Sequence, residues 1–84
     1  MGMKVRLEWY DKETEALAAD EFSIDFGDDD SILAALGLSN EPEIFDGGFD
    51  VLPKWVAMIQ PHFNHQIDTN LFDYQISFRY RNHW

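Results

Sequence analysis

The sequence contains no cysteine among its 84 residues. This absence excludes a disulfide framework and a zinc site built on thiolates. Long apolar runs are missing as well, because no stretch approaches the roughly 20 residues that a membrane-spanning helix requires. No apolar signal-peptide region follows Met1. We therefore expect a cytoplasmic protein, which leaves the cell only in complex with a partner, and we expect no membrane interaction.

Basic residues are scarce: six Lys and Arg stand against sixteen Asp and Glu, which gives a net charge of −10. This balance argues against direct binding of nucleic acid or of an anionic membrane. Residues 8–50 hold fourteen of the acids and a single base, Lys12, whereas the rest of the chain carries a net charge of +3. Because the negative charge is concentrated in one half of the chain, it favours a basic protein partner.

The densest run of acids is DFGDDDS at residues 25–31, and three explanations compete for it. Asp30 or Ser31 can cap a following helix, with Asp28 and Asp29 near its positive end. A calcium loop needs alternating acids, a central Gly and a distal Glu, and this spacing is absent. A docking surface for a basic partner also fits. Capping and docking therefore remain open, and we expect no metal.

The sequence shows little that predicts catalysis. Solvated acids without an apolar pocket are poor acid–base catalysts. His62 and His65 lie in an irregular segment, where such a pair usually contributes hydrogen bonds to loop structure. A nucleophile motif and a glycine-rich phosphate loop are both missing. We therefore expect a protein that is not an enzyme and that has no cofactor.

What the sequence does contain is a folded core. Hydrophobic residues make up 45% of the chain, and seven Phe, three Tyr and three Trp supply most of the buriable area. This content argues against disorder despite the charge. A chain of this length forms one domain, residues 1–84.

Alternating apolar residues predict strands over residues 3–10, 16–26 and 71–81, and residues 49–52 form a fourth, short strand. In the second strand we expect Phe22, Ile24 and Phe26 to face the core and Glu21, Ser23 and Asp25 to face outward. SILAALG at 31–37 predicts an amphipathic helix that ends at Gly37. Residues 53–61, which begin with Pro53, predict a short helix.

The expected fold class is therefore α+β: an antiparallel sheet of about four strands with a short α-helix packed on one face. The opposite face of such a sheet can stay exposed to solvent. A partner could dock on this face, to which we assign Glu8, Tyr10, Glu21, Ser23, Gln75 and Arg79.

Several strings in the chain are specific. They include MGMKVRLEWYDKETE at the start, DFGDD at 25–29, GFDV at 48–51, QPHFNHQID at 60–68 and YQISFRYR near the end. In these strings the chain resembles, nearly from end to end, the cloacin-type immunity proteins. Members of that family inhibit ribonuclease colicins that cleave ribosomal RNA.

The resemblance implies a four-stranded antiparallel sheet with a helix on one face. It also implies a one-to-one complex with the basic C-terminal ribonuclease domain of a cognate bacteriocin, which blocks access to the ribosome and protects the producing cell. The expected partner-binding residues combine acids, aromatic anchors and their neighbours. They are Tyr10, Asp11, Glu13, Glu15, Leu17, Glu21, Ser23, Asp25, Asp28, Asp46, Gly48, Phe49 and Gln75.

Two other classes stay open at this point. The first is an acidic mimic of nucleic acid that occupies a basic DNA-binding protein, and the second is a metal-dependent hydrolase. An exposed strand or aromatic patch could also form a homodimer. For Phe49, packing in the core and contact with a partner are equally compatible with the sequence.

Overall fold

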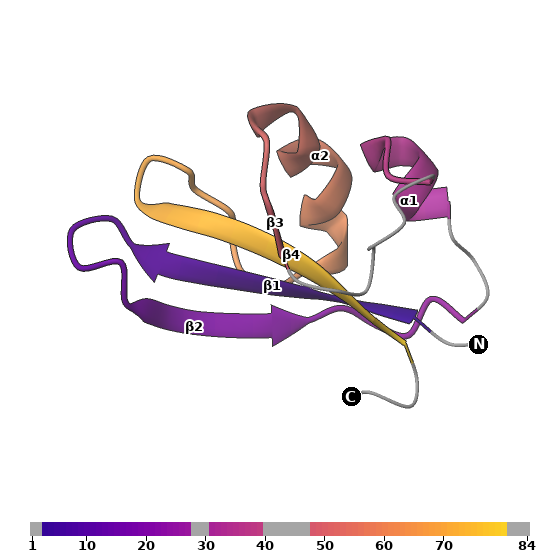
Figure 1. The fold of residues 1–84 in the computed structure, drawn as a ribbon, viewed down its shortest axis with the longest axis horizontal. Coiled ribbons are helices and arrows are strands. Elements are labelled where there is room, and N and C mark those ends of the chain that lie inside the picture. The colour runs from indigo at the N-terminus through magenta and orange to yellow at the C-terminus, as the bar shows by residue number, and fades with distance from the viewer. Residues whose placement is uncertain (1–2, 28–30, 40–47, 81–84) are drawn as a thin grey trace.

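A computed structural model describes residues 3–27, 31–39 and 48–80. Of Tyr80 it describes the backbone alone. Its four strands are β1 (Met3–Asp11), β2 (Leu17–Phe22), β3 (Gly48–Asp50) and β4 (Phe72–Tyr80). They form one antiparallel sheet in the order β2-β1-β4-β3. All helical segments lie above one face of this sheet (Figure 1). The expected α+β fold is confirmed.

The long strands β1 and β4 occupy the centre of the sheet and pair along their whole length, from Met3 opposite Tyr80 to Asp11 opposite Phe72. Both sequences alternate apolar and polar residues, so one face of the pair is buried and the other is left to polar side chains. On the helix side Leu7, Ile76 and Phe78 are completely buried. The alternation therefore predicted both strands and their faces correctly.

Two helical segments cover this buried face. The helix α1 (Ser31–Leu36) ends at Gly37, whose φ of 77° is left-handed. The Leu38 N–H then donates to the Leu33 carbonyl at 2.8 Å, as in a glycine-terminated helix.

Within the described residues, no helix combines the length and apolar character needed to cross a membrane.

The second helical segment is continuous but changes type. It consists of a 3-10 turn, η1 (Pro53–Trp55), the helix α2 (Val56–Ile59) and a second 3-10 turn, η2 (Gln60–His62). Pro53 stands in the first turn of the segment, where a missing N–H costs no hydrogen bond, and Pro61 stands where α2 gives way to η2. The helix expected over 53–61 is therefore present.

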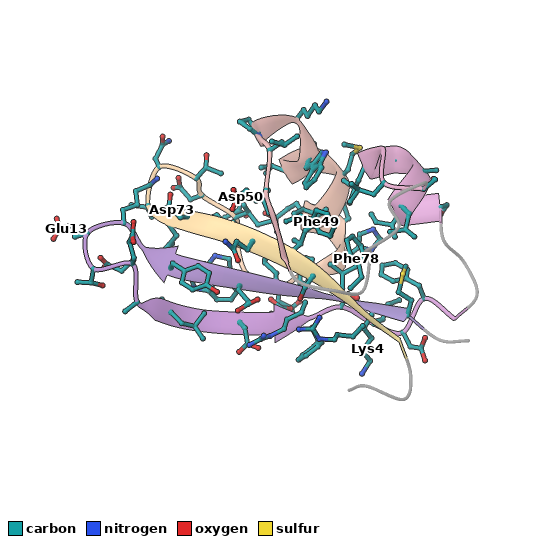
Figure 2. The ribbon with its side chains drawn as sticks, in the orientation of Figure 1. Lys4, Glu13, Phe49, Asp50, Asp73 and Phe78 are labelled. Carbon is teal, nitrogen blue, oxygen red and sulfur yellow. The ribbon has the colours of Figure 1, made fainter. Side chains whose placement is uncertain are left out.

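The core forms between these segments and the sheet. Figure 2 shows Phe49 and Phe78 on the helix side of the sheet, where their rings meet edge to face at 6.0 Å. The same side holds buried apolar residues from every layer of the fold. They are Met3, Val5, Leu7, Ile32, Leu36, Trp55, Ile59, Phe63, Ile67, Tyr74, Ile76 and Phe78.

The second strand differs from the expectation in extent and orientation. It ends at Phe22 instead of residue 26, and the register places Phe22 opposite Arg6, on the face away from the helices. Phe22 and Ile24 are exposed, and Phe26 is only partly buried. Glu21 stands opposite Leu7 and so faces the helix side. Alternation within a strand identifies two faces, but the register alone decides which one is inward.

Candidate functional site

The face of the sheet on which no described helix lies is open, and we call it the outer face. Its residues follow from the strand register. They are Lys4, Arg6, Glu8, Tyr10, Leu17, Asp20, Phe22, Gly48, Asp50, Asp73, Gln75 and Arg79; the register also places Ser77 on this side, but its side chain is buried. Figure 2 shows Lys4 at one end of the sheet and Glu13 at the other. The outer face is therefore basic at the Lys4 end and acidic toward the β1–β2 turn.

One row of the outer face crosses all four strands. Asp20 of β2 stands opposite Glu8 of β1, Glu8 opposite Gln75 of β4, and Gln75 opposite Asp50 of β3. Directly opposed side chains on one face lie about 5 Å apart at Cβ. The row therefore concentrates three carboxylates, and the Gln75 amide donates to Asp50 Oδ1 at 3.2 Å between them.

Arg6 is the cation that balances part of this row. Its Nε donates to Asp20 Oδ2 at 2.9 Å, and its Nη1 lies 3.4 Å from Glu8 Oε2. The hydrogen bond to Asp20 raises the pKa of Arg6 above its ordinary value. The guanidinium also lies over the Phe22 ring, 6.0 Å from its centroid. Arg6 therefore holds the β1–β2 end of the row in a fixed geometry.

Tyr10 is the aromatic residue next to the row. Its hydroxyl donates to Glu8 Oε2 at 2.8 Å, and this bond raises the pKa of Tyr10. The hydroxyl therefore remains protonated and orients the carboxylate of Glu8. Across the strands Tyr10 stands between Leu17 and Asp73. An aromatic ring beside ordered acids is a typical anchor of a protein interface.

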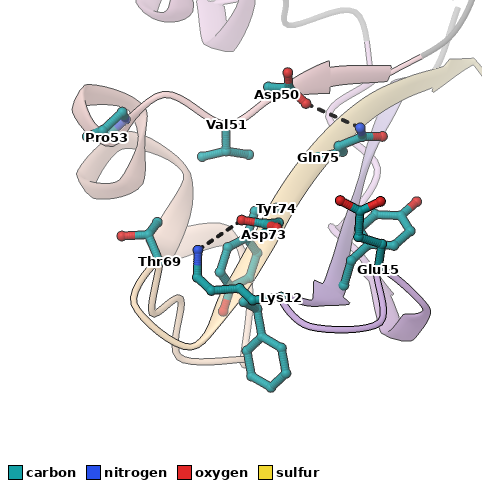
Figure 3. A pocket seen from close by; sticks show the side chains of 11 residues that line it. Lys12, Glu15, Asp50, Val51, Pro53, Thr69, Asp73, Tyr74 and Gln75 are labelled. Carbon is teal, nitrogen blue, oxygen red and sulfur yellow. Dashed lines mark hydrogen bonds and ion pairs between the residues drawn. The ribbon is translucent and has the colours of Figure 1, made fainter.

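A hollow of about 650 Å³ opens beside Tyr10, where β3 leaves the edge of β4. Its walls carry Glu15 on one side and Asp50 and Asp73 on the other, with apolar surface from Val51 and Pro53 (Figure 3). Carboxylates beside apolar surface suit a long basic side chain, whose stem packs while its charge pairs.

One cation already lies in the hollow. Lys12 Nζ is 2.9 Å from Asp73 Oδ1, and both side chains are largely exposed. Exposed pairs of this kind contribute about 0–1 kcal/mol. An incoming Lys or Arg can therefore replace Lys12 at small cost, and Asp73 is available to a partner.

The turn that joins β1 to β2 is ordered by Asp11, the last residue of β1. The Asp11 carboxylate accepts hydrogen bonds from the N–H groups of Thr14 and Glu13, at 2.9 and 2.8 Å. Glu15 has a φ of 60°, and its N–H donates to the Asp11 carbonyl. The turn thus projects Glu13 and Glu15 beyond the sheet in a defined conformation.

These hydrogen bonds lower the pKa of Asp11, with the Thr14 N–H making the largest contribution. The carboxylate is therefore favoured in the folded state. Its contribution to stability is present above the unfolded pKa of about 3.9 and is lost as the pH falls through the lower folded value.

In an NMR titration we expect the Asp11 carboxyl to titrate below the ordinary Asp range. The amides of Glu13 and Thr14 should follow the same midpoint, and a midpoint at or above that range would contradict the turn geometry.

The structure brings only some of the expected partner-binding residues together. Tyr10, Leu17, Gly48 and Gln75 lie on the outer face, Asp11 ends β1, and Glu13 and Glu15 lie in the adjoining turn. Asp25 follows β2 and accepts the Gly27 N–H at 2.7 Å. Asp28 and Asp46 lie outside the described residues. Phe49 stands opposite Ile76 and faces the core.

Glu21 and Ser23 lie on the opposite side from the one expected. The two Glu21 oxygens accept the N–H groups of Asn64 and His65, at 2.8 and 3.0 Å. Ser23 is 5% exposed, and its hydroxyl accepts the Val5 N–H at 2.9 Å. Both side chains accept hydrogen bonds from backbone N–H groups within the fold, so the assignment of these residues to the solvent face was wrong.

Sequence reasoning did not include several residues of this surface in the site. Asp20, Asp50 and Asp73 are acids of the outer face, and Arg6 and Lys12 are the bases paired with them. The alternation of β4 already placed Asp73 with Gln75. Asp20 and Asp50 could be found only from the register, because each belongs to a short strand without a clear pattern.

No cluster of three or more His, Asp or Glu side chains in the described ranges is arranged to hold a metal ion. The carboxylates of the outer face are instead spread across strands and partly paired with Arg6 and Lys12. Such a surface suits a protein partner rather than a small ligand.

Comparison with known families agrees with this geometry. The sequence model of one family, described as cloacin immunity protein, matches residues 2–81. That range includes β1, β4, the acidic row and the QPHFNHQID segment, and it covers nearly the whole chain. The chain therefore belongs to the cloacin immunity protein family and has a role in bacteriocin immunity.

Proposed function

We propose that this protein binds the basic C-terminal ribonuclease domain of its cognate cloacin- or colicin-type toxin in a one-to-one complex. The acidic part of the outer face, the hollow beside Tyr10 and the β1–β2 turn form the contact surface. The observation that carries the proposal is the row Asp20, Glu8, Gln75 and Asp50, which concentrates negative charge on an open sheet face.

The charge of this surface acts first on the rate of encounter. Complementary fields raise association rates by about 10- to 1000-fold at low salt. They also disfavour acidic partners, which contributes to specificity. Affinity then depends on buried anchors at the centre of the contact, and Tyr10 together with Val51 and Pro53 of the hollow supplies this part.

Inhibition of this kind requires no catalytic group. A domain bound on the basic surface of the toxin keeps that surface from ribosomal RNA by bulk and by charge. The protein would act in the cytoplasm of the producing cell, where toxin and ribosomes meet. It would leave the cell only as part of the complex.

The test is stopped-flow association with a purified cloacin-type ribonuclease domain at low and high salt, together with titration calorimetry. We expect one-to-one binding whose association rate constant falls by about 10- to 1000-fold as salt screens the charges. Asp50→Asn should slow association several-fold, because it removes one charge and keeps the Oδ1 acceptor for Gln75.

Asp68→Asn is the matched control. Asp68 lies on the helix side, where its N–H donates to the Tyr74 hydroxyl and its Oδ1 accepts the Asn70 N–H. Its neutralisation should leave the association rate nearly unchanged. Equal effects of the two variants would show that net charge rather than the outer face directs binding. Competition by DNA for many unrelated basic proteins would instead favour the nucleic-acid mimic.

A further inference from the structure

The strand β2 forms a free edge of the sheet. It is the outermost strand in the order β2-β1-β4-β3, and no described element lies beyond it (Figure 1). Five of its six residues are exposed, and Glu21 is only partly buried. Such an edge presents backbone donors and acceptors to any strand of suitable sequence.

The hydrogen-bond pattern shows which backbone groups are free to pair. The Ser23 N–H donates to the Val5 carbonyl at 2.8 Å, so Ser23 directs its backbone toward β1. In an antiparallel ladder this direction alternates from residue to residue. Ala19 and Glu21 therefore pair with β1, whereas Asp20 and Phe22 direct their N–H and C=O groups away from the sheet.

The edge carries only part of the usual protection against pairing. Natural edge strands are protected by Lys, Pro, β-bulges or inward charges that discourage another strand. Glu21 faces the helix side and the register shifts next to Leu17, but residues 17–22, LAADEF, contain neither Lys nor Pro. Leu17 and Phe22 are instead exposed large apolar residues, at 48% and 43%, and Ile24 just beyond is 73% exposed. This edge is therefore suited to strand addition.

Charge selects the kind of strand that fits. Asp20 is an exposed acid of this edge, the adjoining turn carries Glu13 and Glu15, and Arg6, the described base paired with Asp20, belongs to β1. A second copy of this chain brings the same net charge of −10 and is repelled. An extended basic segment is attracted to the same edge.

We infer that β2 accepts an extended basic segment of the toxin as a fifth, edge-added strand. This inference rests on the proposed function and identifies a second part of the interface, next to the acidic row. The outer-face side chains along the edge are Leu17, Asp20 and Phe22, and the register shifts between Leu17 and Ala19. The added strand should therefore place a Lys or Arg against Asp20 and an apolar residue two positions away, beside Phe22.

Amide hydrogen exchange, measured by NMR on the free protein and on its complex with a purified cloacin-type ribonuclease domain, tests this directly. In the complex the amides of Asp20 and Phe22 should become protected by about 10-fold or more, as expected for a new ladder. The amides of Ala19 and Glu21 already pair with β1 and serve as internal controls that change little.

A pair of variants separates backbone pairing from charge. Asp20→Asn removes the charge and keeps the outward N–H, whereas Asp20→Pro removes both. A proline is tolerated on an edge strand where its N–H side faces solvent. We expect Asp20→Pro to raise Kd about 10- to 100-fold beyond Asp20→Asn, because a buried acceptor on the partner is left unpaired. The exchange measurement on the unaltered chain stands if the proline variant does not fold.

The outcomes are distinguishable. A tight complex in which Asp20 and Phe22 stay unprotected overturns the strand addition and leaves the proposed function intact. Protection of the same amides on concentrating the free protein would identify a second copy as the occupant and overturn the choice of a basic segment. Absence of any complex would overturn the proposed function and this inference together.

Discussion

Replacement of Tyr10 by alanine is expected to raise the dissociation rate constant of the toxin complex by about 30- to 1000-fold, which corresponds to about 2–4 kcal/mol. Tyr10 stands on the central strand β1, between the acidic row and the hollow. Aromatic residues at the centre of an interface carry much of its affinity because they exclude water from the surrounding polar contacts. Most such effects fall on dissociation rather than association.

Tyr10→Phe is the matched control for this prediction. It keeps the ring and removes the hydroxyl that donates to Glu8 Oε2 at 2.8 Å. Arg6 still lies 3.4 Å from the same oxygen, so Glu8 retains one partner. We expect the phenylalanine variant to dissociate less than about 10-fold faster, as for one lost hydrogen bond. Unchanged dissociation for Tyr10→Ala, in a variant that remains folded, would place the anchor elsewhere on the protein.

The fold could be predicted from sequence where the pattern was long. In β1 and β4 alternation continues over about nine residues each, and it identified the buried face of both strands. At Gly37 the left-handed φ of 77° is a local requirement that the glycine itself predicts. These elements are determined by their own residues, so no knowledge of their neighbours was needed.

The second strand could not be oriented in the same way. LAADEF has an apolar residue at each end but three positions, Ala18, Ala19 and Asp20, that fit either face. Its orientation depends on contacts with distant parts of the chain, namely the register against β1 and the loop at residues 64–65. The candidate site could not be predicted from the sequence for the same reason, because the acidic row and the hollow form only when the four strands are in register.

The specific string QPHFNHQID at residues 60–68 stabilises a loop and does not belong to the outer face. Gln60 donates to the His65 carbonyl at 2.7 Å and accepts the Ile67 N–H at 2.8 Å, which closes the loop on itself. The His65 ring stacks on Trp9 at 3.8 Å and reaches the Tyr74 hydroxyl at 2.7 Å. The histidine was expected to support loop structure, and these contacts confirm it. Through His65, residues 60–68 are held against Trp9 and Tyr74 on the helix side of the sheet.

Glu21 of β2 binds the same loop, and its replacement is the second change from which we expect a large effect, here on the free energy of unfolding. Its two oxygens accept the Asn64 and His65 N–H groups, more than forty residues away in sequence. Glu21→Ala leaves both donors without this partner, and hydrogen bonds to a charged acceptor contribute about 1.5–3 kcal/mol. We expect the free energy of unfolding in urea to fall by this amount, with faster amide exchange at Asn64 and His65.

Two variants give this prediction its controls. Glu21→Gln retains one carbonyl acceptor and should lose about half as much stability, whereas Glu13→Ala at the exposed tip of the turn should lose almost none, as is usual for surface substitutions. The distinction bears on function because the sequence placed Glu21 among the partner contacts. If Glu21 acts by holding the loop, Glu21→Ala lowers stability and leaves the association rate of the folded protein nearly unchanged. A variant that unfolds normally but associates slowly would show instead that Glu21 contacts the toxin.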